Sequence, residues 1–279
     1  MVGNKKLFEE AGLEFPTESW TEEEFRDAAV KMTDESKGQY GIMFGSGVVD
    51  WGRAIFGNGE TQIYDWDAKK MQATDNDALY HIWDLWIDDL MLNEKAAPAV
   101  LNSKDIGGGF ETGKYGMAFI GFWDIAEIHK VVQDSFEWDL IPLPTNETYG
   151  QWRTQMYANA LSVSANSEKK EAAFEYIKWT LENRDIQTNS VSLPVNKEIS
   201  GDAEFLNEFA DGAKHFNKQL ALDALANSVT WRNTGTVAEI NNNVIKPEIE
   251  RLILKPDSTD LKTVLENIQT EGQKIFDAE

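Results

Sequence analysis

Apolar side chains recur along the chain with two kinds of pattern. The stretch 75–92 has helical spacing, and its apolar stripe consists of Leu79, Ile82, Trp83, Trp86 and Leu90. Short runs rich in apolar residues predict four strands, at 40–44, 115–120, 138–144 and 160–165. Short strands separated by helices are typical of an α/β domain, which is the fold class that we expect.

Capping signals mark further helices. Thr21 and Glu24 have the spacing of a capping box and precede apolar residues at helical intervals. Ser167 is expected to cap a helix that contains Trp179. Pro247 is expected to break or kink a helix in the C-terminal third. No internal repeat or low-complexity segment interrupts this order of elements.

The sequence GKYGMAFIGFWDIAEI, residues 113–128, places a tryptophan at an unusual position. Its apolar run ends at Gly121, and Trp123 stands in the turn before the next helical pattern. A core tryptophan normally lies inside an element, where packing can surround it, whereas one at a turn tends to face a cleft or a partner. Trp51 lies in a glycine-flanked connection and Trp231 in a polar stretch. We interpret these three as candidate ligand contacts, and Trp83, Trp86 and Trp179 as packing residues.

Indoles beside amides and carboxylates have the chemistry of a sugar site. The apolar CH face of a pyranose stacks on the ring, while Asp, Asn and Arg side chains bond its hydroxyls. Asp50 could accept such bonds, and Tyr157 could donate or accept one. For Trp51 and Trp231, ordinary packing stays an open alternative.

The composition of the chain excludes several classes of binding partner. The 279 residues carry a formal net charge of -22, which would repel the phosphates of a nucleic acid and disfavours an anionic membrane surface. The absence of cysteine excludes disulfides and thiol chemistry. No apolar run is long enough to predict a membrane span. The N-terminus lacks the apolar region of a signal peptide.

A search for catalytic patterns selects no residue. The three histidines, His81, His129 and His215, share no metal-ligand spacing. GSGVVD, residues 45–50, lacks the third glycine of a dinucleotide-binding fingerprint, since Asp50 stands there. Carboxylate pairs suited to glycoside hydrolysis are too numerous among 48 acidic residues for one to be singled out. We therefore expect no catalytic group, cofactor or metal site.

Four segments resemble the extracellular solute-binding proteins of bacterial ABC importers, the family that includes maltodextrin-binding protein. In chain order they are NKKLFEEAGLEFPTESWTEEEFRDAAVKM (4–32), the segment 113–128 quoted above, ALSVSANSEKKEAAFEYIKWTL (160–181) and SLPVNKEI (192–199). The resemblance implies a periplasmic-binding-protein-like (type II) fold with a mixed sheet flanked by helices. It also implies that a solute is captured between two lobes that close by a hinge.

The resemblance assigns roles to particular residues. In proteins similar to this one, the tryptophan at the position of Trp123 stacks on the bound sugar, and the loop at Asp50 and Trp51 lines the cleft. The chain departs from the common pattern at Phe122, where proline is frequent, and at Tyr157 and the following alanine, where glycines often face the ligand.

The resemblance also predicts the division into lobes. Residues 1–157 and 213–279 would form the second, C-terminal lobe, and 158–212 would be a returning segment of a first lobe that is otherwise missing. The strand at 160–165 would then lack neighbouring strands, so its edges would need other partners. We expect this segment to be poorly ordered, repacked or engaged with another chain.

Together these observations predict an extracytoplasmic solute-binding component of an ABC importer that binds a sugar or oligosaccharide and acts with permease subunits. The candidate ligand-binding residues are Trp123, Trp51, Asp50, Trp231 and Tyr157. Three alternatives stay open: a binder of a peptide or cationic solute, a glycan-active enzyme, and an interaction domain without a small ligand. Fold analogy alone does not separate them.

Overall fold

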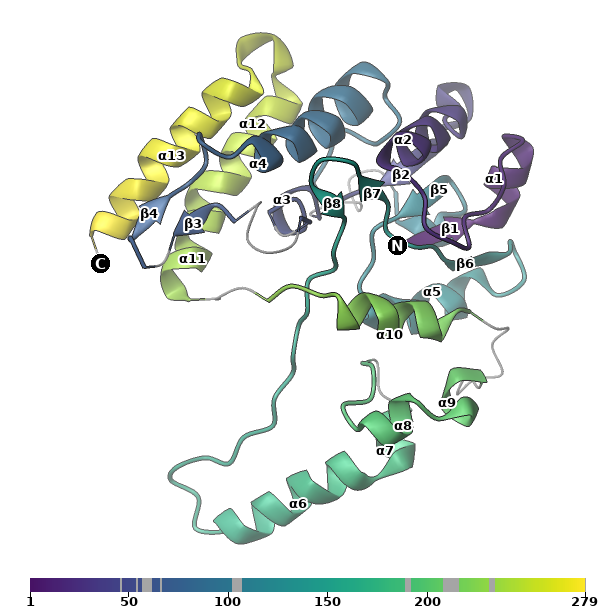
Figure 1. Cartoon of the computed structure of the whole chain (residues 1–279), viewed down its shortest axis with the longest axis vertical. Coiled ribbons are helices and arrows are strands. Elements are labelled where there is room, and N and C mark those ends of the chain that lie inside the picture. Colours follow the sequence, from purple (N-terminus) through teal and green to yellow (C-terminus); the bar gives the residue numbers. More distant parts are fainter. Residues whose placement is uncertain are drawn as a thin grey trace.

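A four-stranded mixed sheet lies on the side of the main body that holds the N-terminus (Figure 1). The computed structural model describes residues 1–45, 47–53, 55–56, 62–65, 67–101, 107–188, 192–207, 216–230 and 234–278. The sheet has the order β2-β5-β1-β6. Its strands are β1 (Val2–Asn4), β2 (Tyr40–Met43), β5 (Tyr115–Ala118) and β6 (Trp138–Leu140). β5 runs parallel to β2 and antiparallel to β1, which confirms the α/β class and three of the predicted strands.

Helices cover this sheet and extend the body on one side. The first part contributes α1 (Lys5–Glu10), α2 (Glu22–Lys31), α3 (Gly47–Asp50), α4 (Asp77–Trp83), η3 (Asp84–Asn93) and α5 (Ile125–Val132), with short turns η1 (Glu35–Lys37), η5 (Phe110–Thr112) and η6 (Phe122–Asp124). The C-terminal part contributes α10 (Lys218–Ala226), α11 (Gly235–Ile240), η7 (Asn241–Ile245), α12 (Lys246–Leu254), η8 (Pro256–Ser258) and α13 (Leu261–Asp277). Two hairpins, β3 (Tyr64–Asp65) with β4 (Lys70–Met71) and β7 (Thr145–Asn146) with β8 (Gly150–Gln151), complete it.

The local signals explain why these helices begin where they do. Thr21 and Glu24 form the predicted capping box at the start of α2. The predicted helix 75–92 is confirmed as α4, capped by Asn76, and continues in wider π-helical turns as η3. Pro247 does not break its helix, since helical turns continue from α11 through the π-helical η7 into α12. The wider turns of η7 lie directly before the proline.

Aromatic residues dominate the main core. Trp83 and Trp86 are fully buried, as predicted. Trp86 packs against Phe119 and Trp152, with ring centroids 5.1 and 5.4 Å apart, and so connects η3 to the end of β5 and to the segment after β8. A second, smaller cluster lies between the sheet and α5; its buried members are Val2, Phe110, Tyr115, Ala118, Ile128 and Val132.

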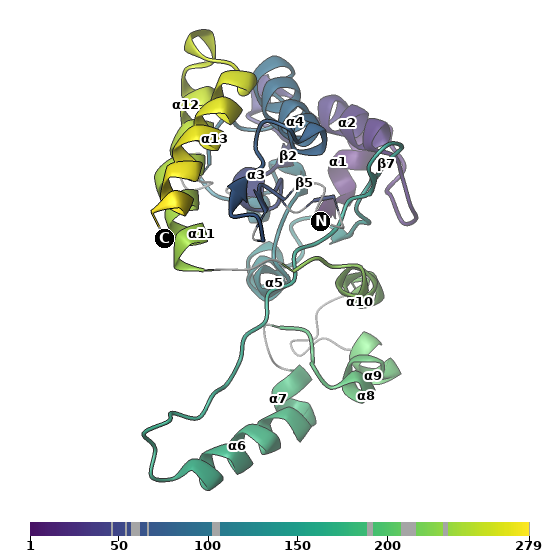
Figure 2. The same cartoon turned by 60° about the vertical axis from the view of Figure 1, so that its left-hand side comes forward.

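A long excursion leaves the body after β8. Residues 156–169 contain no helix or strand and lead to α6 (Lys170–Glu182), α7 (Arg184–Thr188), α8 (Lys197–Ser200) and α9 (Ala203–Asn207). In Figure 1 and in the rotated view of Figure 2, α6 and α7 lie well apart from the sheet. The strand predicted at 160–165 does not form, because no strand of the described residues lies beside it to pair with.

Helix α6 differs from the prediction at both its start and its surface. Its N-cap is Lys169 rather than Ser167, whose hydroxyl instead accepts a hydrogen bond from the Lys169 N–H at 3.1 Å. None of its residues is buried. The prediction that Trp179 packs in a core is wrong in this structure, since its side chain is 51% exposed and contacts the ring of Tyr176. Phe174 and Leu181 are exposed as well. Helix α6 therefore carries the apolar surface of a core helix without a covering layer.

Carboxylates gather near the N-terminus of α13. Asp88 of η3 is partly buried and lies near Asp84 and Asp260, the residue that caps α13. Burial first, and then these two charges, raise the pKa of Asp88 from 3.8 to about 6. The native state thus binds this proton more tightly than the unfolded chain. The ionised carboxylate therefore lowers stability above about pH 6, and this cost disappears as the pH falls toward the unfolded pKa.

Asp88→Asn is expected to raise the free energy of unfolding by about 1 kcal/mol at neutral pH, a value reduced for solvent screening of a partly exposed group. Near the unfolded pKa of Asp88 the variant and the parent should be almost equally stable. Urea unfolding at the two pH values measures this difference, with Asp75→Asn, at an exposed position, as the control. The same gain at both pH values would contradict the electrostatic origin.

Candidate functional site

Trp123 is presented by a short, fixed turn. The chain leaves β5, passes Gly121 and forms the single turn η6 before α5 begins. The Gly121 N–H donates to the Asp124 carboxylate at 2.9 Å, and the Asp124 N–H donates to the Gly121 carbonyl at 3.0 Å. A side chain at Gly121 would place its Cβ 2.1 Å from the Trp123 ring, so only glycine lets the indole lie over the backbone here. The Trp123 side chain is 47% exposed.

Tyr157, at the start of the excursion, meets this indole edge to face. The two ring centroids are 5.6 Å apart and the planes lie at 85°. The Tyr157 side chain is 52% exposed, and its hydroxyl donates to Gln155 Oε1 at 2.6 Å. The structure therefore brings together two of the residues predicted from the sequence, and it adds Gln155, which was not predicted.

Asp50, at the C-terminal end of α3, is held by two donors. Its Oδ1 accepts from Arg53 Nη2 at 3.0 Å and from Asn241 Nδ2 at 3.2 Å. The Arg53 guanidinium is fully buried, and its Nε also donates to the Val49 carbonyl at 2.9 Å. The Asp50 carboxylate is thus fixed in place and its charge is largely compensated.

The Asp50–Arg53 pair acts on the Tyr157 hydroxyl. Burial raises the pKa of Tyr157, the charge of Asp50 raises it further, and the charge of Arg53 opposes both. The pair therefore lies within electrostatic reach of the hydroxyl. Tyr157 stays protonated at neutral pH and can both donate and accept hydrogen bonds.

The other two predicted tryptophans have different surroundings. Trp51 is partly buried and packs against Phe119, with ring centroids 5.2 Å apart. It is therefore more enclosed than Trp123. Trp231 lies outside the described residues. The segment before it is placed, because the Val229 carbonyl accepts from Met156 N–H at 2.9 Å and its N–H donates to the Thr154 carbonyl at 2.9 Å.

Three residues near the candidate site that were not predicted, Gln155, Arg53 and Asn241, nevertheless have recognisable features in the sequence. Gln155 and Tyr157 are two apart in an extended segment, a spacing that places side chains on one side. Arg53 follows Asp50 by three residues, which suits an ion pair over one helical turn. Asn241 begins a polar triplet inside an otherwise apolar helical pattern.

His81, the histidine with the best-defined partners, belongs to the main body and not to the candidate site. His81 Nε2 lies 2.6 Å from the buried Glu22 carboxylate, which also accepts from Asn146 Nδ2 at 2.9 Å and from Trp152 Nε1 at 2.8 Å. The hydrogen bond to Glu22 raises the pKa of His81. In the part of the chain that the structure describes, no three His, Asp or Glu side chains are placed to hold a metal ion.

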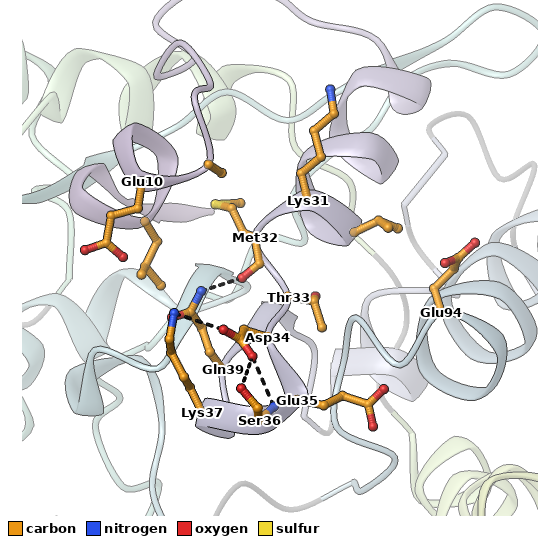
Figure 3. A pocket seen from close by; sticks show the side chains of 13 residues that line it. Glu10, Lys31, Met32, Thr33, Asp34, Glu35, Ser36, Lys37, Gln39 and Glu94 are labelled. Carbon is orange, nitrogen blue, oxygen red and sulfur yellow. Dashed lines mark hydrogen bonds and ion pairs between the residues drawn. The ribbon is translucent and has the colours of Figure 1, made fainter.

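A separate hollow of about 570 Å³ lies between α1, α2, η1 and Glu94 (Figure 3). Its polar groups bond one another: Asp34 accepts from Ser36 and pairs with Lys37 at 2.9 Å, and Gln39 donates to the Met32 carbonyl at 2.6 Å. These contacts stabilise the turn after α2. Neither Trp123 nor Tyr157 lines this hollow, so we place the candidate site elsewhere.

Comparisons with solved structures identify the fold. The ABC substrate-binding protein Lmo0181 from Listeria monocytogenes, in complex with cycloalternan, is 21% identical with a TM-score of 0.72; the match covers 98% of this chain and 68% of that chain. The sugar-binding protein MalE from Xanthomonas citri is 14% identical with a TM-score of 0.78, covering 99% and 68%. UgpB from Mycobacterium tuberculosis, in complex with glycerophosphocholine, is 20% identical with a TM-score of 0.74, covering 99% and 68%.

These matches confirm a periplasmic-binding-protein-like fold in a chain that is shorter than its structural neighbours. No curated protein sequence matches the chain. Within the described ranges, no helix combines the length and the apolar character needed to cross a membrane. A family model for bacterial extracellular solute-binding proteins matches residues 1–185. The chain therefore belongs to the bacterial extracellular solute-binding proteins, as its sequence resemblance to the solute-binding components of ABC importers indicated.

Proposed function

We propose that this chain captures a sugar or oligosaccharide for an ABC importer without altering it chemically. The observation that carries the proposal is the exposed corner formed by the rings of Trp123 and Tyr157. The fixed carboxylate of Asp50 is close enough for its charge to raise the pKa of Tyr157. Stacking of a pyranose on Trp123 would bury the apolar face of the sugar. Tyr157 would form a side wall, and Asp50 would accept hydroxyl hydrogen bonds. Trp51 and Trp231 would supply further aromatic contacts.

The charge balance of the site favours a neutral ligand over a cationic one. An aromatic corner beside a free carboxylate would suit a cation. Here, however, Arg53 and Asn241 already bond the Asp50 carboxylate. A compensated carboxylate still accepts hydrogen bonds, which is what a hydroxylated solute offers. Among the structural neighbours, Lmo0181 is in complex with the neutral saccharide cycloalternan, and UgpB with glycerophosphocholine, which carries both a quaternary ammonium and a phosphate.

We further propose the lobe division expected from the sequence, with 1–157 and 213–279 in one lobe and 158–212 in the other. Two observations support it: the uncovered apolar surface of α6, and the 68% share of the neighbouring chains that is matched. The remainder of the first lobe would pack against α6, and that lobe would close over Trp123. Closure would enclose the sugar and strengthen every polar contact to it. The permease subunits would then receive the closed form, outside the cytoplasm.

A fluorescence titration tests the proposal. Tryptophan emission is followed while monosaccharides and oligosaccharides are added to this chain and to a version extended N-terminally by a first lobe. We expect saturable binding by the extended protein and weaker binding by this chain, because enclosure contributes to affinity. A folded protein that responds only to choline-type cations or peptides would favour those ligands instead. Release of a hydrolysis product would favour a glycan-active enzyme.

A further inference from the structure

Gln155 carries a buried group without a partner. The residue is only 8% exposed, and its Oε1 accepts from the Tyr157 hydroxyl at 2.6 Å. Its Nε2, on the same amide, has no hydrogen-bond partner among the described residues. A buried donor that stays unbonded is unfavourable, and such donors are uncommon in folded proteins.

Asn241 carries the complementary group. Its Nδ2 donates to the Asp50 carboxylate at 3.2 Å, while its Oδ1 is buried and lacks a donor in the part of the chain that the structure describes. One amide therefore offers an unused donor beside Tyr157, and the other offers an unused acceptor beside Asp50. Gln155 bonds the Tyr157 hydroxyl, Asn241 bonds the Asp50 carboxylate, and the charge of that carboxylate raises the pKa of Tyr157.

We infer that the bound solute completes the hydrogen bonds of Gln155 and Asn241, and that these two amides select for hydroxyl groups. The inference rests on the proposed function. Gln155 Nε2 donates to a ligand oxygen, and Asn241 Oδ1 accepts from a ligand hydroxyl. The Tyr157 hydroxyl bonds Oε1 of the Gln155 amide, so Nε2 is the atom of this amide that is left for the ligand. A solute without hydroxyls leaves both amides unbonded.

Two properties distinguish this role from a structural one. An amide that stabilises the fold would lose stability on replacement by an apolar side chain of similar size. An amide that awaits a ligand would instead leave stability unchanged or raise it, since an unbonded polar group is removed from the interior. Ligand affinity would fall at the same time, because the hydroxyl would lose its partner.

The test compares Gln155→Met with Gln151→Met, whose glutamine lies exposed in the β7–β8 hairpin. We expect Gln155→Met to keep the melting temperature of the parent and to weaken saccharide binding by about tenfold, the effect of one lost hydrogen bond to a polar ligand. Gln151→Met should change neither. A series of deoxygenated sugars adds a second criterion. The sugar that lacks the hydroxyl bonded by Gln155 should bind the parent chain weakly, and its affinity should not fall further in Gln155→Met.

Each outcome decides between the two proposals. A lower melting temperature with unchanged affinity in Gln155→Met would assign the amide to the fold and overturn the inference alone. Unchanged affinity and unchanged stability would overturn it as well. A parent chain that gives no saccharide response, in either the present or the extended form, would overturn the proposed function and the inference with it.

Discussion

Replacing Trp123 by alanine is expected to weaken saccharide binding by about a hundredfold, the effect typical of an aromatic residue at the centre of a binding surface. The indole is half exposed, lies over the Gly121 backbone and contacts the ring of Tyr157. Its removal leaves the core intact, so the free energy of unfolding should stay within about 0.5 kcal/mol of the parent value. Loss of affinity without loss of stability would identify Trp123 as a ligand contact.

Calorimetry is the suitable measurement, because the substitution also removes a fluorescent reporter. In the present chain, Trp179→Ala is a matched control: its indole is exposed to a similar extent but lies on α6, apart from the site. Trp123→Phe should recover part of the affinity, since a smaller aromatic face remains for stacking. If Trp123→Ala and the parent bound saccharide with equal affinity, Trp123 would be an ordinary surface residue and not a ligand contact.

Trp152→Ala should lower the free energy of unfolding by about 4 kcal/mol, the loss typical of a large aromatic residue in a packed core. The side chain is 1% exposed and lies between the rings of Phe25, Trp86 and Phe119, at centroid distances of 5.1, 5.4 and 6.1 Å. Its Nε1 donates to the buried Glu22 carboxylate at 2.8 Å. Truncation would therefore open a cavity and remove one of the donors to Glu22.

Two further variants separate these contributions. Trp152→Phe keeps most of the packing but removes the indole N–H, and we expect it to lose about 2 kcal/mol. Trp179→Ala removes the same side chain from the exposed surface of α6 and should change stability by less than about 0.5 kcal/mol. Urea unfolding measures all three. A loss in Trp179→Ala as large as that in Trp152→Ala would mean that α6 is packed in solution.

Local signals predicted the elements whose partners are close in sequence. The capping box at Thr21 and the stripe of 75–92 depend on neighbours within a few residues, so both are confirmed. The strand at 160–165 depends on partners elsewhere, and an apolar run does not encode whether such partners are present. The π-helical turns of η3 were not predicted either, because they arise where a helix adapts to its packing.

The same distinction applies to the candidate site. Trp123 was predicted because its glycine-flanked turn is a local feature, and Tyr157 because it stands near the predicted crossing between lobes. Gln155 and Asn241 were not among the candidates predicted from the sequence, since their unbonded buried atoms follow from the packing of distant segments. Trp51 was predicted as a candidate ligand contact, with ordinary packing as an open alternative, and contact with Phe119, far away in sequence, encloses it in part.

The pairing of residues 154–156 with Val229 closes the long excursion where it leaves and rejoins the body. The entropy lost on closing a flexible loop grows only with the logarithm of its length, so doubling the loop adds only about 0.6 kcal/mol. The body can therefore carry excursions of very different size and content at nearly constant stability. Gln155 and Tyr157 lie at this junction. A change in the conformation of the excursion would therefore alter the candidate site directly, without any change in the packing of the core.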